Sequence, residues 1–211
     1  MIMSSVNVDE IESLWNEHWR SYKLSWFFRY LWIDIKKEMK RVIQPFPKHY
    51  KILDFGCGVG RTMQIFKESN FKNVKGSDIS PVCLNKCEKK GFNLGKDIFL
   101  VDKEKTPFDD DEFDVVFSDG LLEHYKDITH LVKEMCRISK NYVLLLQPNH
   151  TSFLGLLFHL FPNFKARIKE QKHPLSDYKK CFKKFNFKLV KVINIHFNQE
   201  FFLLFQKTIN N

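Results

Sequence analysis

The chain has 211 residues and a net charge of +9, with 44% hydrophobic and 15% aromatic residues. This length and apolar content predict one compact domain and exclude a disordered or collagen-like chain. The sequence has no run of about 18 apolar residues and no secretory signal pattern. Its five cysteines include no Cys-x-x-Cys pair. We therefore expect a cytoplasmic protein with reduced thiols, and neither a membrane span nor a structural zinc site.

The N-terminal segment, residues 1–47, is rich in aromatic residues and is predicted to be helical over residues 9–44. Four aromatic residues recur at helical spacing and therefore share one face of the helix: Trp15, Trp19, Tyr22 and Trp26. Pro45 and Pro47 end the helix, because proline removes a backbone donor and disfavours helix in the residue before it. The aromatic face either packs as ordinary core or covers a ligand.

Beyond this segment, short apolar runs alternate with helical patterns. The apolar runs predict strands at residues Lys51–Phe55, 74–77, 98–101, 113–117 and 142–146. The segments between them predict helices at residues 64–69, 81–90 and 128–139. Ser80 suits the N-cap of the second of these helices, Pro81 its first position and Gly91 its C-terminal cap. Such alternation indicates an α/β fold with a parallel sheet covered on both faces.

The C-terminal part has a different pattern. Residues 151–173 are irregular and partly apolar, and residues 175–184 predict a basic helix. Residues 188–196 and 201–206 predict an antiparallel hairpin with a short Asn-containing turn. Residues 165–191 carry ten basic and two acidic side chains, which is nearly the whole charge excess. This stretch is either a solvated surface or a contact for an anionic partner such as nucleic acid, lipid headgroups or a phosphorylated substrate.

A glycine-rich loop directly follows the first predicted strand. Gly56, Gly58 and Gly60 alternate with other residues between this strand and the next helix. Glycine permits positive φ angles and close approach of a ligand to the backbone, and amides at a helix start offer donors. The loop therefore predicts a nucleotide-like ligand at the carboxyl edge of the sheet. The pattern G-x-G-x-G differs from the dinucleotide fingerprint G-x-G-x-x-G and from the Walker A motif.

Two carboxylates accompany this loop. Asp54 precedes the first glycine by two residues, where it would repel a pyrophosphate and would suit an ammonium group. Asp78 ends the second predicted strand, 22 residues after Gly56. A carboxylate at that place accepts hydrogen bonds from both hydroxyls of a ribose.

These segments resemble the class I S-adenosylmethionine-dependent methyltransferases. The sequence I-L-D-F-G-C-G-V-G-R at residues 52–61 resembles motif I of that family, and G-S-D-I-S at residues 76–80 resembles the acidic end of its second strand. The resemblance extends over residues 48–148 and continues weakly through residues 173–187. It implies a Rossmann-like, doubly wound, three-layer α/β/α domain over residues 48–211. The implied seven-stranded sheet has the order 3-2-1-4-5-7-6, with its seventh strand antiparallel.

The resemblance also implies a set of cofactor-binding residues for S-adenosyl-L-methionine and its product S-adenosyl-L-homocysteine. The glycine loop, with Gly56, Gly58 and Gly60, would lie alongside the methionine and ribose. Asp54 would face the amino group, and Asp78 would bind the ribose. The other implied residues are Ile79 at the adenine, Asp102 and Lys103 at the adenine amino group, and Asp119, Gly120 and Leu121 at the methionine and sulfonium.

Candidate catalytic residues follow the fourth and fifth predicted strands. His124 and His150 would both lie at the cofactor edge, where a base is needed only if the nucleophile must lose a proton. His124 adjoins Glu123, and this pair is alternatively a structural feature of a helix start. The histidines form no metal-binding pattern, so no metal is expected. Two segments are candidates for the acceptor pocket: the N-terminal segment as a lid, with Trp19, Tyr22 and Trp26, and residues 151–173 as a substrate-side insertion.

The leading hypothesis is a methyltransferase that acts on a small-molecule or lipid-like acceptor. One alternative is an RNA or protein methyltransferase that uses the basic stretch at residues 165–191, with a steep salt dependence of binding. Another alternative is a non-catalytic partner subunit that binds the cofactor. The glycine spacing disfavours a dehydrogenase.

Overall fold

The protein is described here by a computed structural model. The description covers Ser13, Asn16, Glu17 and residues 26–101, 105–149, 171–195 and 198–208, with the backbone alone for residues 26–33. No helix among these residues is long and apolar enough to cross a bilayer.

Seven strands form one sheet with the order β3-β2-β1-β4-β5-β7-β6. The strands are β1 (Lys51–Phe55), β2 (Asn73–Asp78), β3 (Ile98–Leu100), β4 (Phe113–Asp119), β5 (Ser139–Pro148), β6 (Phe187–Ile195) and β7 (Glu200–Lys207). Strand β7 runs antiparallel to both of its neighbours, and the pairings among the first five strands are parallel. The expected strand order, the antiparallel seventh strand and the C-terminal hairpin are therefore confirmed.

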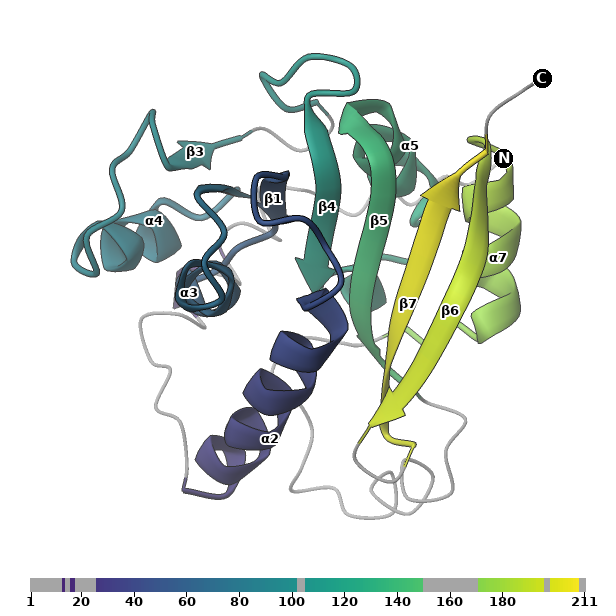
Figure 1. Ribbon diagram of the computed structural model, residues 1–211, viewed down its shortest axis with the longest axis horizontal. Helices are drawn as coiled ribbons and strands as arrows, with labels where there is room; N and C mark the ends of the chain where they lie inside the picture. Colours follow the sequence, from purple (N-terminus) through teal and green to yellow (C-terminus); the bar gives the residue numbers. More distant parts are fainter. Residues whose placement is uncertain are drawn as a thin grey trace.

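Helices cover both faces of this sheet (Figure 1). They are α2 (Trp26–Ile43), α3 (Arg61–Glu68), α4 (Pro81–Glu88), the short 3-10 helix η1 (Leu122–His124), α5 (Thr129–Ile138) and α7 (Leu175–Lys183). Helices α2, α3 and α4 contribute to one hydrophobic cluster, and α5 and α7 contribute to the other. The three-layer arrangement follows, with one core on each side of the sheet.

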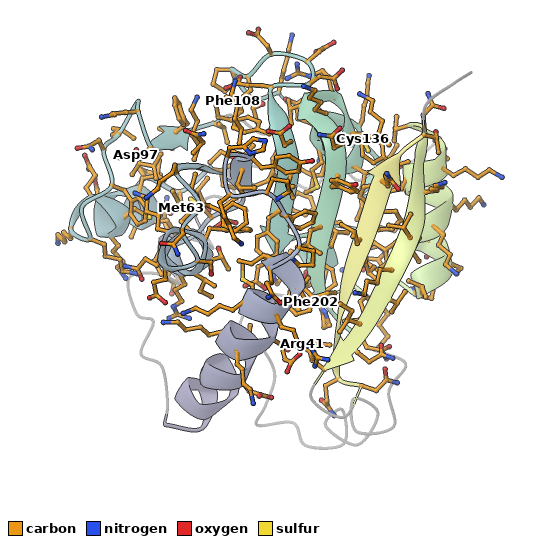
Figure 2. The ribbon with its side chains drawn as sticks, in the orientation of Figure 1. Arg41, Met63, Asp97, Phe108, Cys136 and Phe202 are labelled. Atoms are coloured by element: carbon orange, nitrogen blue, oxygen red, sulfur yellow. The ribbon has the colours of Figure 1, made fainter. Side chains whose placement is uncertain are left out.

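Successive strand residues belong to opposite cores. Ile52 packs in the cluster of α2 and α3, whereas the next residue, Leu53, packs in the cluster of α5 and α7. Phe202 on β7 belongs to the first cluster and lies next to α2 in Figure 2. Because side chains alternate between the faces of a strand, burial of both faces explains why the strands read as continuous apolar runs.

The local signals at helix ends are confirmed by the backbone. Ser80 caps α4 and accepts a hydrogen bond from the amide of Cys83 at 3.2 Å, with Pro81 at the first helical position. Gly91 has a φ of +87°, and the amide of Phe92 bonds the carbonyl of Cys87, which is a left-handed C-terminal cap. Strand β5 begins at Ser139, three residues before its predicted start, because Ser139 already pairs with Phe113 of β4 and a register shift separates this pair from the apolar part that begins at Tyr142.

Candidate functional site

The glycine loop connects β1 to α3 and is fixed against the end of β2. The carbonyl of Ser77 accepts hydrogen bonds from the amides of Gly56 at 2.8 Å and Cys57 at 2.9 Å. Gly56, Gly58 and Gly60 have φ angles of +78°, +50° and +71°, a region that residues with a side chain rarely adopt. The loop is thus a rigid backbone surface at the carboxyl edge of the sheet.

The surroundings of Gly56 and Gly76 leave no room for a Cβ atom at either position. A Cβ atom on Gly56 would lie 3.1 Å from the nearest atom of Leu121, which borders the loop from the end of β4. A Cβ atom on Gly76 would lie 2.9 Å from the Cβ of Cys57 and would also collide with Met63, which Figure 2 labels on α3. The absence of side chains at these positions lets the loop, β2 and α3 pack closely.

Asp78 joins the end of β2 to the glycine loop. Its Oδ2 accepts a hydrogen bond from the amide of Gly58 and its Oδ1 accepts one from the amide of Ser80, both at 2.8 Å. The deep setting raises the pKa of Asp78 to about 6, although these backbone donors oppose the shift. Each carboxylate oxygen can accept a second hydrogen bond, and the side chain is partly exposed. Asp78 can therefore bind a diol while it holds the loop in place.

Asp54 is fully buried at the end of β1. Thr62, in the first turn of α3, donates a hydrogen bond from its hydroxyl to Asp54 Oδ2. No hydrogen-bond donor among the described residues reaches Asp54 Oδ1. Burial raises the pKa of Asp54 to about 7, against the effect of the Thr62 hydrogen bond. A buried carboxylate oxygen of this kind fits an ammonium group, which would supply both the missing donor and the missing positive charge.

Asp119 ends β4 and is partly exposed at the same edge. Its setting raises the pKa of Asp119 to about 8, first through burial and then through the negative charges of Glu200 and Asp54, while Arg61 opposes the shift. Gly120 follows with a φ of +61°. The positive φ turns the chain after β4, and the next residue, Leu121, borders the glycine loop.

The three carboxylates lie on one face of the sheet. Ile52, Val74 and Phe117 belong to the core cluster of α3, and each precedes one of the three carboxylates by an even number of residues on its strand. Alternation therefore places Asp54, Asp78 and Asp119 on the α3 face of three neighbouring strands. This row matches a ligand that carries hydroxyl groups at one end and positive charge at the other.

The other predicted site residues are placed as follows. Ile79 directly follows Asp78 at the edge and is partly exposed. Trp26 begins α2, where the backbone alone is described. The remaining ones lie outside the described residues: Trp19, Tyr22, Asp102, Lys103 and His150.

His124 lies in η1, directly after the end of β4. Its Nε2 lies 3.9 Å from Glu123 Oε1, and both side chains are at most 10% exposed. Glu123 also packs against Gly120, because a Cβ atom there would lie 3.3 Å from its Oε1. In the described part of the chain, no group of three or more His, Cys, Asp or Glu side chains is arranged to hold a metal ion.

The structure adds residues that the sequence patterns did not identify. Thr62 bonds Asp54, and its place in the first helical turn after the loop is the one signal that could have indicated this role. Asn16, in the N-terminal segment, accepts a hydrogen bond from the Ser80 hydroxyl at 2.6 Å. Ser80 lies two residues after Asp78, which ends β2. Part of the N-terminal segment therefore reaches the carboxyl edge of the sheet.

Comparisons with known proteins agree with this geometry. Residues 53–146 match the family model described as a methyltransferase domain. The chain is 28% identical over 191 residues to 2-methyl-6-phytyl-1,4-hydroquinone methyltransferase 2 of Oryza sativa subsp. japonica, covering 81% of this chain and 52% of the relative. It is 27% identical over 111 residues to ajmaline N-methyltransferase of Rauvolfia serpentina, covering 50% of this chain and 38% of the relative. The chain thus spans about half the length, or less, of these curated relatives.

A solved structure shows the same fold. Magnesium protoporphyrin IX methyltransferase from Synechocystis PCC 6803, with bound S-adenosylhomocysteine, superposes with a TM-score of 0.71 at 15% identity, covering 96% of this chain and 100% of that one. The strand order, the glycine loop with its row of carboxylates and the family match lead to one conclusion. Residues 53–146 match a methyltransferase domain, and the chain has the fold of the class I, S-adenosylmethionine-dependent methyltransferases.

Proposed function

We propose that the protein transfers a methyl group from S-adenosylmethionine to a small-molecule or lipid-like acceptor. The observation that carries this proposal is Asp54. Its Oδ1 is buried beside the glycine loop without a donor among the described residues, on the same face as Asp78. Few ligands combine an ammonium group with a ribose, and the proposed cofactor does.

The residues then have defined roles. Asp54 binds the amino group, and the glycine loop lies alongside the amino-acid and ribose parts. Asp78 accepts hydrogen bonds from the ribose hydroxyls. The bound cofactor supplies a methyl group on a positively charged sulfur. Asp119, with Gly120 and Leu121, borders the reacting end. Transfer requires little covalent help, so the protein acts mainly by positioning the two reactants and excluding water.

The N-terminal segment, residues 1–47, is proposed to close over the site as a lid. The hydrogen bond between Ser80 and Asn16 supports this role, because it brings the segment to the cofactor edge. We also propose that Trp19, Tyr22 and Trp26 and the insertion at residues 151–173 line the acceptor pocket. His150 and His124 remain candidate bases, and Asp102, Lys103 and Ile79 remain proposed adenine contacts. The two curated relatives described above are named for 2-methyl-6-phytyl-1,4-hydroquinone and ajmaline, which supports a small organic acceptor.

A second candidate is methylation of an RNA or a protein through the basic stretch at residues 165–191. One observation favours it: six lysines on α7 and on the segment through β6 are exposed, namely Lys179, Lys180, Lys183, Lys184, Lys188 and Lys191. Binding of such an acceptor would weaken steeply with added salt.

The location is proposed to be cytoplasmic, which the five buried free cysteines support.

Isothermal titration with S-adenosylhomocysteine tests the proposal. We expect binding to the wild type and at least about tenfold weaker binding to Asp78→Ala, since that variant loses the ribose acceptor and the bond to Gly58. Circular dichroism of both proteins serves as the folding control. A well-folded wild type that does not bind the ligand would refute the proposal.

A further inference from the structure

Glu200 is the first residue of β7 and is partly exposed. Because β7 runs antiparallel to β5, its first residue lies at the carboxyl edge of the parallel strands. Glu200 pairs there with Pro148, the last residue of β5. A carboxylate from the C-terminal hairpin thus reaches the edge that holds the glycine loop.

Glu200 also lies on the same face as the row of carboxylates. It alternates with Phe202, which packs in the cluster of α3, just as Asp119 alternates with Phe117 in that cluster. Strand β5 separates the strands of Asp119 and Glu200, and Glu200 lies two residues beyond the β7 residue level with Asp119, so their backbones are about 12 Å apart. The charge of Glu200 is the largest charge effect among those that raise the pKa of Asp119. The two carboxylates therefore face a common space.

On the intervening strand β5, Leu146 pairs with Asp119 and Pro148 pairs with Glu200, and neither side chain offers a hydrogen-bonding group. In the proposed function, the cofactor runs along the edge from Asp78 on β2 to Asp54 and Asp119 on β1 and β4. The transferred methyl then faces the next strands, β5 and β7. Among the described residues of these two strand ends, Glu200 supplies the charged side chain at that place.

We propose that Glu200 is the acceptor-binding carboxylate of this site and that it receives a hydroxyl nucleophile. This inference rests on the proposed function. During transfer the acceptor oxygen forms the bond to the methyl carbon, the carbon–sulfur bond breaks with its electron pair going to sulfur, and the hydroxyl proton passes to Glu200. Charge, atoms and electrons balance, with a neutral thioether, a methyl ether and a carboxylic acid as products.

The charges in the site favour a hydroxyl over an amine. Carboxylates close to an amine stabilise its protonated form, which has no lone pair for attack. A hydroxyl that donates a hydrogen bond to a carboxylate instead becomes a better nucleophile, because its proton is already directed at a base. The charge of Glu200 beside the acceptor therefore makes the site unfavourable for a neutral amine.

The position of Glu200 can be tested without knowing the natural acceptor. Sinefungin carries an ammonium group in place of the methyl-sulfonium, whereas S-adenosylhomocysteine is neutral there. Glu200→Gln should weaken sinefungin binding by about fivefold and change S-adenosylhomocysteine binding by less than twofold, because one charge at the methyl position is lost. Glu200→Asp keeps the charge and should retain most of the preference. Glu88→Gln, at the exposed end of α4, is the matched control and should change neither affinity.

The outcomes separate the two proposals. A wild type that binds neither ligand refutes the proposed function itself. If Glu200→Gln weakens both ligands equally, or neither, Glu200 does not face the methyl and the inference is overturned.

The hydroxyl assignment is tested with tritiated S-adenosylmethionine and two probes, 4-dodecylphenol and dodecylamine. We expect the wild type to methylate the phenol, and Glu200→Gln to lower kcat by at least about tenfold with the KM for S-adenosylmethionine changed less than twofold. Methylation of the amine in preference to the phenol, or of neither probe by protein that binds S-adenosylhomocysteine, would overturn the assignment.

Discussion

Replacement of Asp54 by asparagine should make the ligand-free protein more stable at pH 8. Burial raises the pKa of Asp54 from 3.8 to about 7 in the folded state. A raised folded pKa means that the stabilising effect of protonation is complete below pH 3.8 and is lost as the pH rises through about 7. The difference between these two pKa values corresponds to about 4 kcal/mol of unfolding free energy at pH 8.

Asparagine has no charge to bury, and its Oδ1 can still accept the hydrogen bond from Thr62. Its amide group would need a new acceptor, which costs about 1–3 kcal/mol. We therefore expect Asp54→Asn to be more stable than the wild type by about 1–3 kcal/mol at pH 8. This advantage should shrink by about 2 kcal/mol at pH 5.5, where more of the wild-type carboxyl is protonated.

Urea unfolding of both proteins at pH 5.5 and pH 8, without ligand, measures these differences. Asp109→Asn, on an exposed acidic turn, is the control and should show no such pH dependence relative to the wild type. Isothermal titration should show that Asp54→Asn binds S-adenosylhomocysteine at least about tenfold more weakly, because a charge-assisted hydrogen bond is lost. A stability difference that is independent of pH, or unchanged affinity, would show that Asp54 is not the buried ligand carboxylate.

Two further predictions concern packing and a buried ion pair. Gly76→Ala should lower the unfolding free energy by about 1–3 kcal/mol in urea, because its Cβ would lie 2.9 Å from the Cβ of Cys57. Adding Met63→Ala should not restore stability fully, since the Cys57 contact remains; full recovery would contradict the argument. Arg137→Ala should cost about 2–3 kcal/mol at pH 7, because Glu134 is buried and accepts its bonds at 2.7 and 2.8 Å. Thermal unfolding tests this, and an unchanged Tm would count against it.

Sequence patterns predict those strands and helix ends that are determined by residues close together in the chain. Lys51–Phe55 is a strand with the predicted bounds, because a short apolar run directly before glycines is too short for a buried helix and fits a buried strand. Ser80 and Pro81 define the start of α4, because an N-cap and a proline at the first position act on residues within one helical turn. The strand order, in contrast, came from the family resemblance, because periodicity carries no information on which strands pair.

Long-range contacts at the site could not be predicted in the same way. The hydrogen bond from Gly58 to Asp78 joins residues that are 20 positions apart, and it exists because β1 and β2 pair in one register. Glu200 reaches the cofactor edge only through the register of β7 with β5, in which it pairs with Pro148. A shift of that register by one residue would turn the Glu200 side chain to the opposite face of the sheet.

The row of carboxylates has a consequence for turnover. After burial, the charge of Asp78 raises the pKa of Asp54, and the charges of Glu200 and Asp54 raise the pKa of Asp119, which Arg61 only partly offsets. A cationic ligand relieves this repulsion, so its binding stabilises the folded protein by mass action. In the proposed reaction, the positive charge beside Asp119 and Glu200 disappears when the methyl group leaves. The same carboxylates that favour the cofactor then hold its neutral product less strongly, which promotes exchange of product for a new cofactor molecule.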